Sequence, residues 1–135
     1  MNTTLKNILA VLAGLAGGSI VNMALVAFGP ILIPPPVGVD MTTAEGLKAG
    51  IHLLEPKHFL FPFLAHAIGT LAGSWIAVKF GASHHKTLSM VIGAFFFTGG
   101  LMMIMMIPSP LWFSLTDLIL AYFPMAWLGY KFTGR

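Results

Sequence analysis

The chain has no cysteine and few charges. Without cysteine it forms no disulfide, thiolate metal site, iron–sulfur cluster or covalent haem attachment. Only 8% of its 135 residues are charged, against about 25% in a typical soluble domain. Its net charge of +3 comes from scattered basic residues, so no basic stripe is present to neutralise the phosphates of a nucleic acid. These shortages exclude a water-coated globule and argue against a nucleic-acid-binding protein.

What the chain has instead is apolar residues, which make up 57% of it. Long apolar runs predict an all-α integral membrane protein, a four-helix bundle forming a single domain over residues 1–135. The first run is too long for the apolar core of a secretory signal, so we interpret it as a retained span. The four predicted spans are about 8–28, 59–78, 88–107 and 111–130.

The longest connection lies between the first and second spans. Gly29-Pro30 is expected to end the first helix, and Thr42-Thr43-Ala44-Glu45 resembles a capping box that opens a short amphipathic helix over about 43–54. This helix is too short to span, so we expect it to lie along the membrane surface as a lid.

The distribution of basic residues predicts the orientation. Under a four-span arrangement Lys48 and Lys57 fall on one side of the membrane, and the other five basic residues fall on the opposite side: Lys6, Lys79, Lys86, Lys131 and Arg135. The positive-inside rule then places both termini in the cytoplasm and the short helix outside.

The second span is the one around which the others are expected to pack. Pro62, His66, Gly69, Thr70 and Gly73 share one face of it, so small and polar groups form a stripe. A histidine within the hydrocarbon is costly unless it faces protein or water, and the stripe is therefore predicted to face the bundle.

The first span carries a similar smooth face. Gly14 and Gly18 form a G-x-x-x-G pair, and Asn22 continues the row. Small residues at this spacing allow close approach of another helix, either within the chain or from a second copy.

Polar groups from three spans are expected to meet. At 1.5 Å per residue, Asn22, His66 and Asp117 each lie about 9–11 Å below the outer surface of the hydrocarbon. Intramembrane ionisable groups usually pair, so we predict a hydrogen bond between His66 and Asp117, with Asn22 nearby, as a polar ligand-binding site. Three plainer interpretations remain open: an interhelical clamp, Asn22 as packing glue, and a helix that starts at Ser114 and leaves Asp117 near the interface.

A metal site is considered outside the membrane, where His52, Glu55 and His58 cluster in the sequence. Imidazole and carboxylate suit zinc, but the three residues lack a diagnostic spacing. We interpret them as a solvated loop face, and no metal or other cofactor is predicted.

Two further stretches resemble known proteins. LAHAIGTLAGSWIAV and SLTDLILAYFPMAWLG, with the glycine-rich third span between them, look like an uncharacterised family of small four-span bacterial inner-membrane proteins. The resemblance covers most of residues 59–130. It implies a bacterial inner membrane and assigns no activity or functional residue.

Three functions are compatible with these features. The first is a helical binding or assembly protein, whose partners would be the lipid bilayer, a second copy or another membrane protein. The second is an oligomeric transporter or channel unit for a small solute or a proton, using Asn22, His66 and Asp117. The third and least favoured is an enzyme acting on a lipid headgroup, because no serine or cysteine nucleophile has a convincing spacing.

Overall fold

The computed structural model describes all 135 residues, of which 79% are helical, and contains no strand. Four of its helical segments are long and apolar enough to cross a membrane, at Thr3–Leu32, Pro56–Phe80, His85–Met106 and Leu111–Phe132. The all-α fold with four apolar helices is therefore confirmed. The individual helices are α1 (Thr3–Leu32), α2 (Ala44–Gly50), α3 (Leu60–Phe80), α4 (His85–Met106), α5 (Leu111–Leu120) and α6 (Phe123–Phe132).

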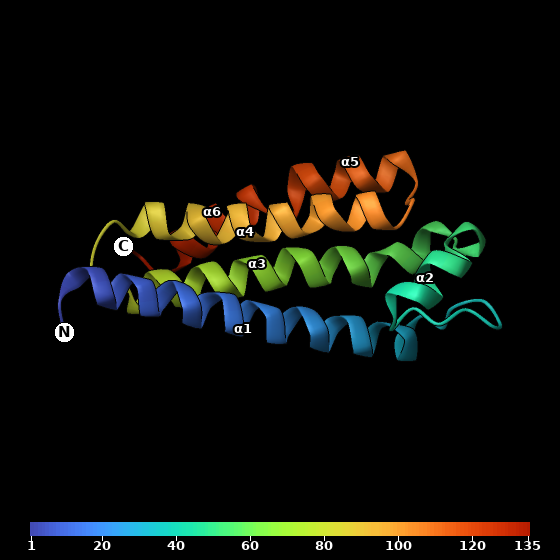
Figure 1. Ribbon diagram of the computed structural model, residues 1–135, viewed down its shortest axis with the longest axis horizontal. Helices are drawn as coiled ribbons and strands as arrows, with labels where there is room; N and C mark the ends of the chain where they lie inside the picture. Colours follow the sequence, from blue (N-terminus) through green and yellow to red (C-terminus); the bar gives the residue numbers. More distant parts are fainter.

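Helix α3 occupies the centre of the bundle. It packs most extensively against α1, and against α6 and α4 on its other sides. Figure 1 shows α3 between α1 and α4, with both termini at one end and α2 at the other. We call these the terminal end and the α2 end.

The close approach of α1 and α3 depends on glycines in both helices. A Cβ atom on Gly18 would lie 2.6 Å from the Gly69 carbonyl oxygen, and one on Gly73 would lie 2.7 Å from the Gly14 carbonyl oxygen. Two G-x-x-x-G pairs therefore pack against each other, backbone to backbone. The partner of Gly14 and Gly18 is α3 of the same chain.

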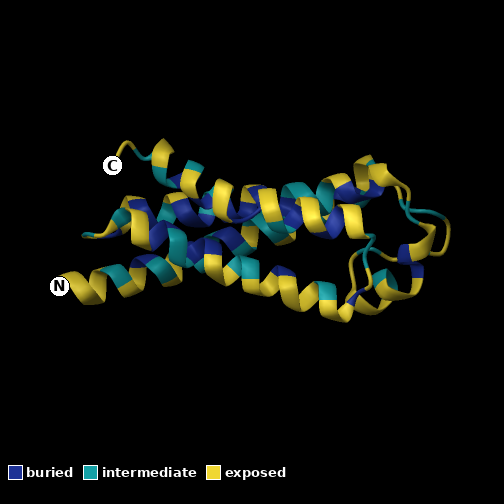
Figure 2. Cartoon of the chain, turned by 90° about the horizontal axis from the view of Figure 1, so that it is seen from above, coloured by how far each residue is buried: buried dark blue, intermediate teal, exposed yellow.

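The outside of the bundle is apolar, whereas its interior is built largely from small residues. Ile20 and Met23 on α1 and Phe95 on α4 are 67%, 69% and 60% exposed, and α1 is exposed along most of its length (Figure 2). Ala65 and Ala77 of α3 are fully buried. An apolar coat around a small-residue core is the arrangement expected when the surrounding solvent is lipid.

One predicted helix end, at Gly29-Pro30, is wrong, and the fourth span contains a break. Helix α1 continues through Pro30 to Leu32, because the lost proline N–H removes only one bond of the ladder and the Ile33 N–H still donates to the Gly29 carbonyl at 2.8 Å. The fourth span is not continuous but breaks at Ala121 and Tyr122. Pro124 lies in the first turn of α6, where a proline has no helical N–H to lose.

The helix in the long connection is shorter than the predicted 43–54. Helix α2 covers Ala44–Gly50 and is followed by 3₁₀ turns at Ile51–Leu53 and Pro56–Phe59. The expected capping box does not form, since the N-cap is Thr43, whose hydroxyl accepts from the Gly46 N–H at 3.0 Å. Thr42 is engaged elsewhere, with its hydroxyl donating to Asp40 at 2.6 Å.

Candidate functional site

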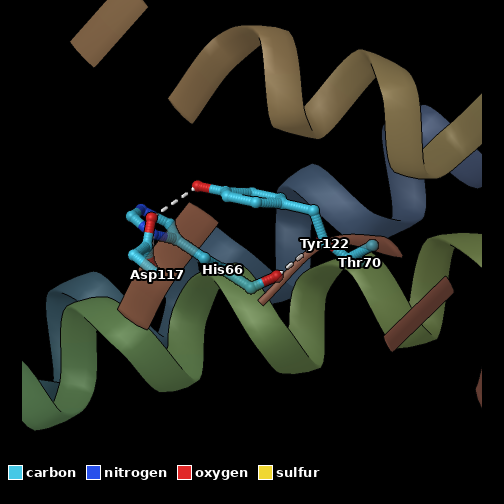
Figure 3. A network of polar contacts seen from close by, with 4 residues as sticks. All are labelled: His66, Thr70, Asp117 and Tyr122. Carbon is cyan, nitrogen blue, oxygen red and sulfur yellow. Dashed lines mark hydrogen bonds and ion pairs between the residues drawn. The ribbon is translucent and has the colours of Figure 1, made fainter. Parts of the chain in front are cut away.

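The hydrogen bond predicted between His66 and Asp117 is present. Nδ1 of His66, on α3, lies 2.7 Å from Oδ1 of Asp117, on α5 (Figure 3). Asp117 is 3% exposed, whereas the His66 side chain is 23% exposed. The carboxyl is thus enclosed by the bundle, while part of the imidazole remains accessible.

Tyr122 joins His66 and Asp117 in a hydrogen-bonded cluster, and the sequence did not predict it. Its hydroxyl donates to Oδ2 of Asp117 at 2.9 Å, and its ring stacks on His66 with centroids 5.8 Å apart. In a continuous helix, residues five apart point about 140° away from each other. The break after α5 brings the two side chains together, and Gly100 of α4 leaves room for the phenol, because a Cβ there would overlap its hydroxyl.

The Ser114 alternative for Asp117 is excluded by the start of α5. The helix begins at Leu111, and the Ser114 N–H already donates to the Pro110 carbonyl at 3.0 Å. Ser114 is therefore inside the helix rather than its N-cap. Asp117 lies in the second turn, buried against α3.

Two other hydroxyl groups of α3, one in the stripe and one next to it, bond to backbone carbonyls. Thr70 donates to the His66 carbonyl at 2.7 Å, and Ser74 donates to the Ala126 carbonyl of α6 at 2.6 Å. Both side chains are buried. The Thr70 bond stays within α3, whereas the Ser74 bond joins α3 to α6. His66 is the only member of the stripe whose side chain bonds to another ionisable group.

A cavity of about 310 Å³ lies between His66 and the α2 end. At about 30 Å³ per water, this is room for roughly ten water molecules. Asn22, His66, Gly100 and Asp117 contribute to its lining, as do Thr42 and Thr43 beside α2. Most of the wall is apolar and includes Leu47, Ile51, Leu54, Ile104, Ile107 and Phe113.

Asn22 lines the cavity but does not join the hydrogen-bonded cluster. No side-chain hydrogen bond forms between Asn22 and either His66 or Asp117. The structure therefore brings the three predicted site residues to one cavity and bonds two of them directly.

The prediction that His52, Glu55 and His58 form a solvated loop face is wrong for His58. This side chain is 5% exposed, and both ring nitrogens meet backbone groups. Nδ1 accepts from the Glu55 N–H at 2.8 Å, and Nε2 lies 3.1 Å from the Pro34 carbonyl oxygen. His58 is buried and forms part of a capping box at the 3₁₀ turn that leads into α3.

Comparisons with protein families, with curated proteins and with solved structures find no match for this chain.

Proposed function

We propose that this chain is a binding protein of the bacterial inner membrane, with both termini in the cytoplasm. In this proposal the cavity below α2 takes up a small amphiphilic molecule from the outer side. The orientation is supported by five basic residues at the terminal end, against Lys48 and Lys57 at the α2 end. The bacterial setting is supported only by the sequence resemblance.

The observation that carries the proposal is the unoccupied edge of His66. Nδ1 is engaged by Asp117, and no protein group bonds to Nε2. An apolar cavity with a few convergent polar groups is the usual form of a small-molecule site. A ligand with a polar end at His66 and Asn22, and an apolar body against Ile104 and Phe113, would match the lining.

A binding role fits better than assembly through α1. The smooth face expected to receive a neighbour already receives α3, since added Cβ atoms on Gly14 and Gly18 would meet carbonyl oxygens of Gly73 and Gly69. Transport also has less support, because Thr70, the next polar side chain of α3 beyond His66, is buried and donates to a carbonyl of its own helix.

The test is saturable binding of 4-phenylbutanol, a neutral probe with an aromatic body and one hydroxyl. The full chain in lipid nanodiscs is titrated with the probe, and uptake by empty nanodiscs is subtracted. Ile104→Trp fills the cavity from α4, and Met105→Trp is its matched control, because Met105 is 86% exposed and does not line the cavity.

We expect the natural chain and Met105→Trp to bind with equal affinity, and Ile104→Trp to bind at least tenfold more weakly. Absence of saturable binding to the natural chain would contradict the proposal. Equal binding by both tryptophan variants would contradict it as well.

A further inference from the structure

The acidic residues of this chain all lie toward the α2 end. Asp40, Glu45 and Glu55 are in the connection between α1 and α3, and Asp117 is in the second turn of α5. Against these four acids the same end carries two lysines, so its formal charge is negative, while the terminal end has basic residues only. None of the seven lysines and arginines lines the cavity.

The base of the cavity carries an uncompensated negative charge when Asp117 is ionised and His66 is neutral. An ionised Asp117 only accepts hydrogen bonds, so Nδ1 of His66 is the donor in the 2.7 Å bond. Nε2 of the neutral ring is then unprotonated and can accept a hydrogen bond. Protonation at Nε2 brings the charge of the pair to zero.

We propose that the ligand of this cavity is an amphiphilic cation with a protonated amine at one end, and that it competes with a proton for His66. The ammonium N–H donates to Nε2, and its charge is balanced by Asp117 behind the ring. A proton on Nε2 removes the acceptor and repels the ammonium. Binding to the imidazolium form therefore releases that proton to water, and no covalent bond changes. This inference rests on the proposed binding function and specifies its ligand.

Two titratable groups contact the His66 ring. Asp117 approaches from α5, and Tyr122 approaches from the break before α6 with its hydroxyl bonded to Asp117. The cavity lining from α1 and α4 contains no titratable side chain: it consists of Asn22, Val26, Gly100, Met103 and Ile104. The lining residues in and beside α2 are methionine, threonine, alanine, leucine and isoleucine, so none of them titrates either.

The first test varies the charge of the probe and leaves the protein unchanged. Three probes share one body: 4-phenylbutylamine, 4-phenylbutanol and 4-phenylbutanoate. The amine stays protonated up to a pH of about 10, as a lysine does. At pH 8 we expect the amine to bind at least tenfold more tightly than the alcohol, and the carboxylate to bind least tightly.

The same titrations between pH 5 and pH 8 test the competition. Affinity for the amine should rise with pH, approaching tenfold per unit where the imidazole is protonated, with release of up to one proton per ligand in weakly buffered solution. The alcohol can donate to the neutral ring or accept from the charged ring, so its affinity should be nearly independent of pH. A pH-independent amine affinity, or an amine no tighter than the alcohol, would overturn the inference.

Two variants test whether the carboxylate of Asp117 is the charge that attracts the amine. Asp117→Asn should lower the ratio of amine affinity to alcohol affinity at least tenfold. Glu45→Gln removes an exposed acid outside the cavity, where salt screens its charge, and should change neither affinity. An unchanged ratio of amine to alcohol in Asp117→Asn would refute the role of Asp117; if this variant does not fold, the probe and pH series decide the question alone.

The outcomes separate this inference from the function on which it rests. If the alcohol and the amine bind equally and Ile104→Trp weakens both, the cavity is a binding site and the cation preference is wrong. If no probe binds saturably, both proposals are wrong.

Discussion

Replacing Gly14 by alanine tests the packing of α1 on α3. The new Cβ would lie 2.5 Å from the Gly73 carbonyl oxygen and 3.0 Å from the Ala77 Cβ, with Ile92 also in contact. The clash is with backbone, so no side-chain rotation relieves it and the helices must separate. Overpacking of this kind typically costs about 1–3 kcal/mol.

Gly99→Ala supplies the matched control, because a Cβ at Gly99 meets nothing within 4 Å. Both variants gain about 1 kcal/mol of helix propensity, so that gain cancels in the comparison. Gly14→Ala should therefore be less stable than Gly99→Ala by about 1–3 kcal/mol.

The free energy of unfolding is measured by titrating the folded protein in mild detergent with sodium dodecyl sulfate and following helicity. Equal stability of the two variants would refute the glycine-to-backbone packing. A changed oligomeric state with unchanged stability would show that Gly14 faces a second copy instead.

Three other predictions concern side chains that form hydrogen bonds in this structure. Tyr122→Phe removes the phenol's bond to Asp117 and should lower the free energy of unfolding by about 0.6–2 kcal/mol in the same titration. Ser74→Ala removes a bond to an α6 carbonyl and should cost a similar amount; no loss in either variant would show that the bond does not stabilise the bundle. Hydrogen bonds from the Thr42 hydroxyl, and secondly from the Thr42 N–H, lower the pKa of Asp40 from its usual 3.8. The stability that these bonds give the connection between α1 and α3 is therefore fully present above pH 3.8 and is lost as the pH falls through the lowered pKa. The amide resonance of Thr42 should report that loss, and an amide unaffected by acid would contradict it.

The fold was predictable because each span carries its own signal. Four long apolar runs need no tertiary information to be recognised. The pairing of His66 with Asp117 was predictable for a similar reason, since both lie at similar depth and an unpaired charge is costly in hydrocarbon. The depth of two residues and the cost of an unpaired charge do not show which third side chain joins the pair.

Tyr122 was missed because its position depends on the break in the fourth span. Pro124 marks a possible break, but the residue at which a helix stops depends on packing, here against Gly100. Pro30 shows the opposite outcome, since α1 continues through it. A proline in the sequence therefore does not predict on its own whether a span is interrupted.

The partner of the α1 glycines was left open by the sequence for a further reason. Gly14 and Gly18 are compatible with any smooth helix face. Gly69 and Gly73 have the same spacing on α3, but only the structure shows the two pairs in contact. Likewise, the burial of His58 depends on the Pro34 carbonyl, which lies 24 residues away in the chain.

The central claim is that one edge of His66 is held by Asp117 while the other edge faces the contents of the cavity. Nitrogen-15 NMR of the labelled imidazole in nanodiscs measures both edges in one experiment. We predict a protonated Nδ1 and an Nε2 resonance that shifts as 4-phenylbutylamine is added at pH 8, up to saturation. An Nε2 resonance that does not move with the probe, or a neutral ring whose proton is on Nε2, would contradict the claim.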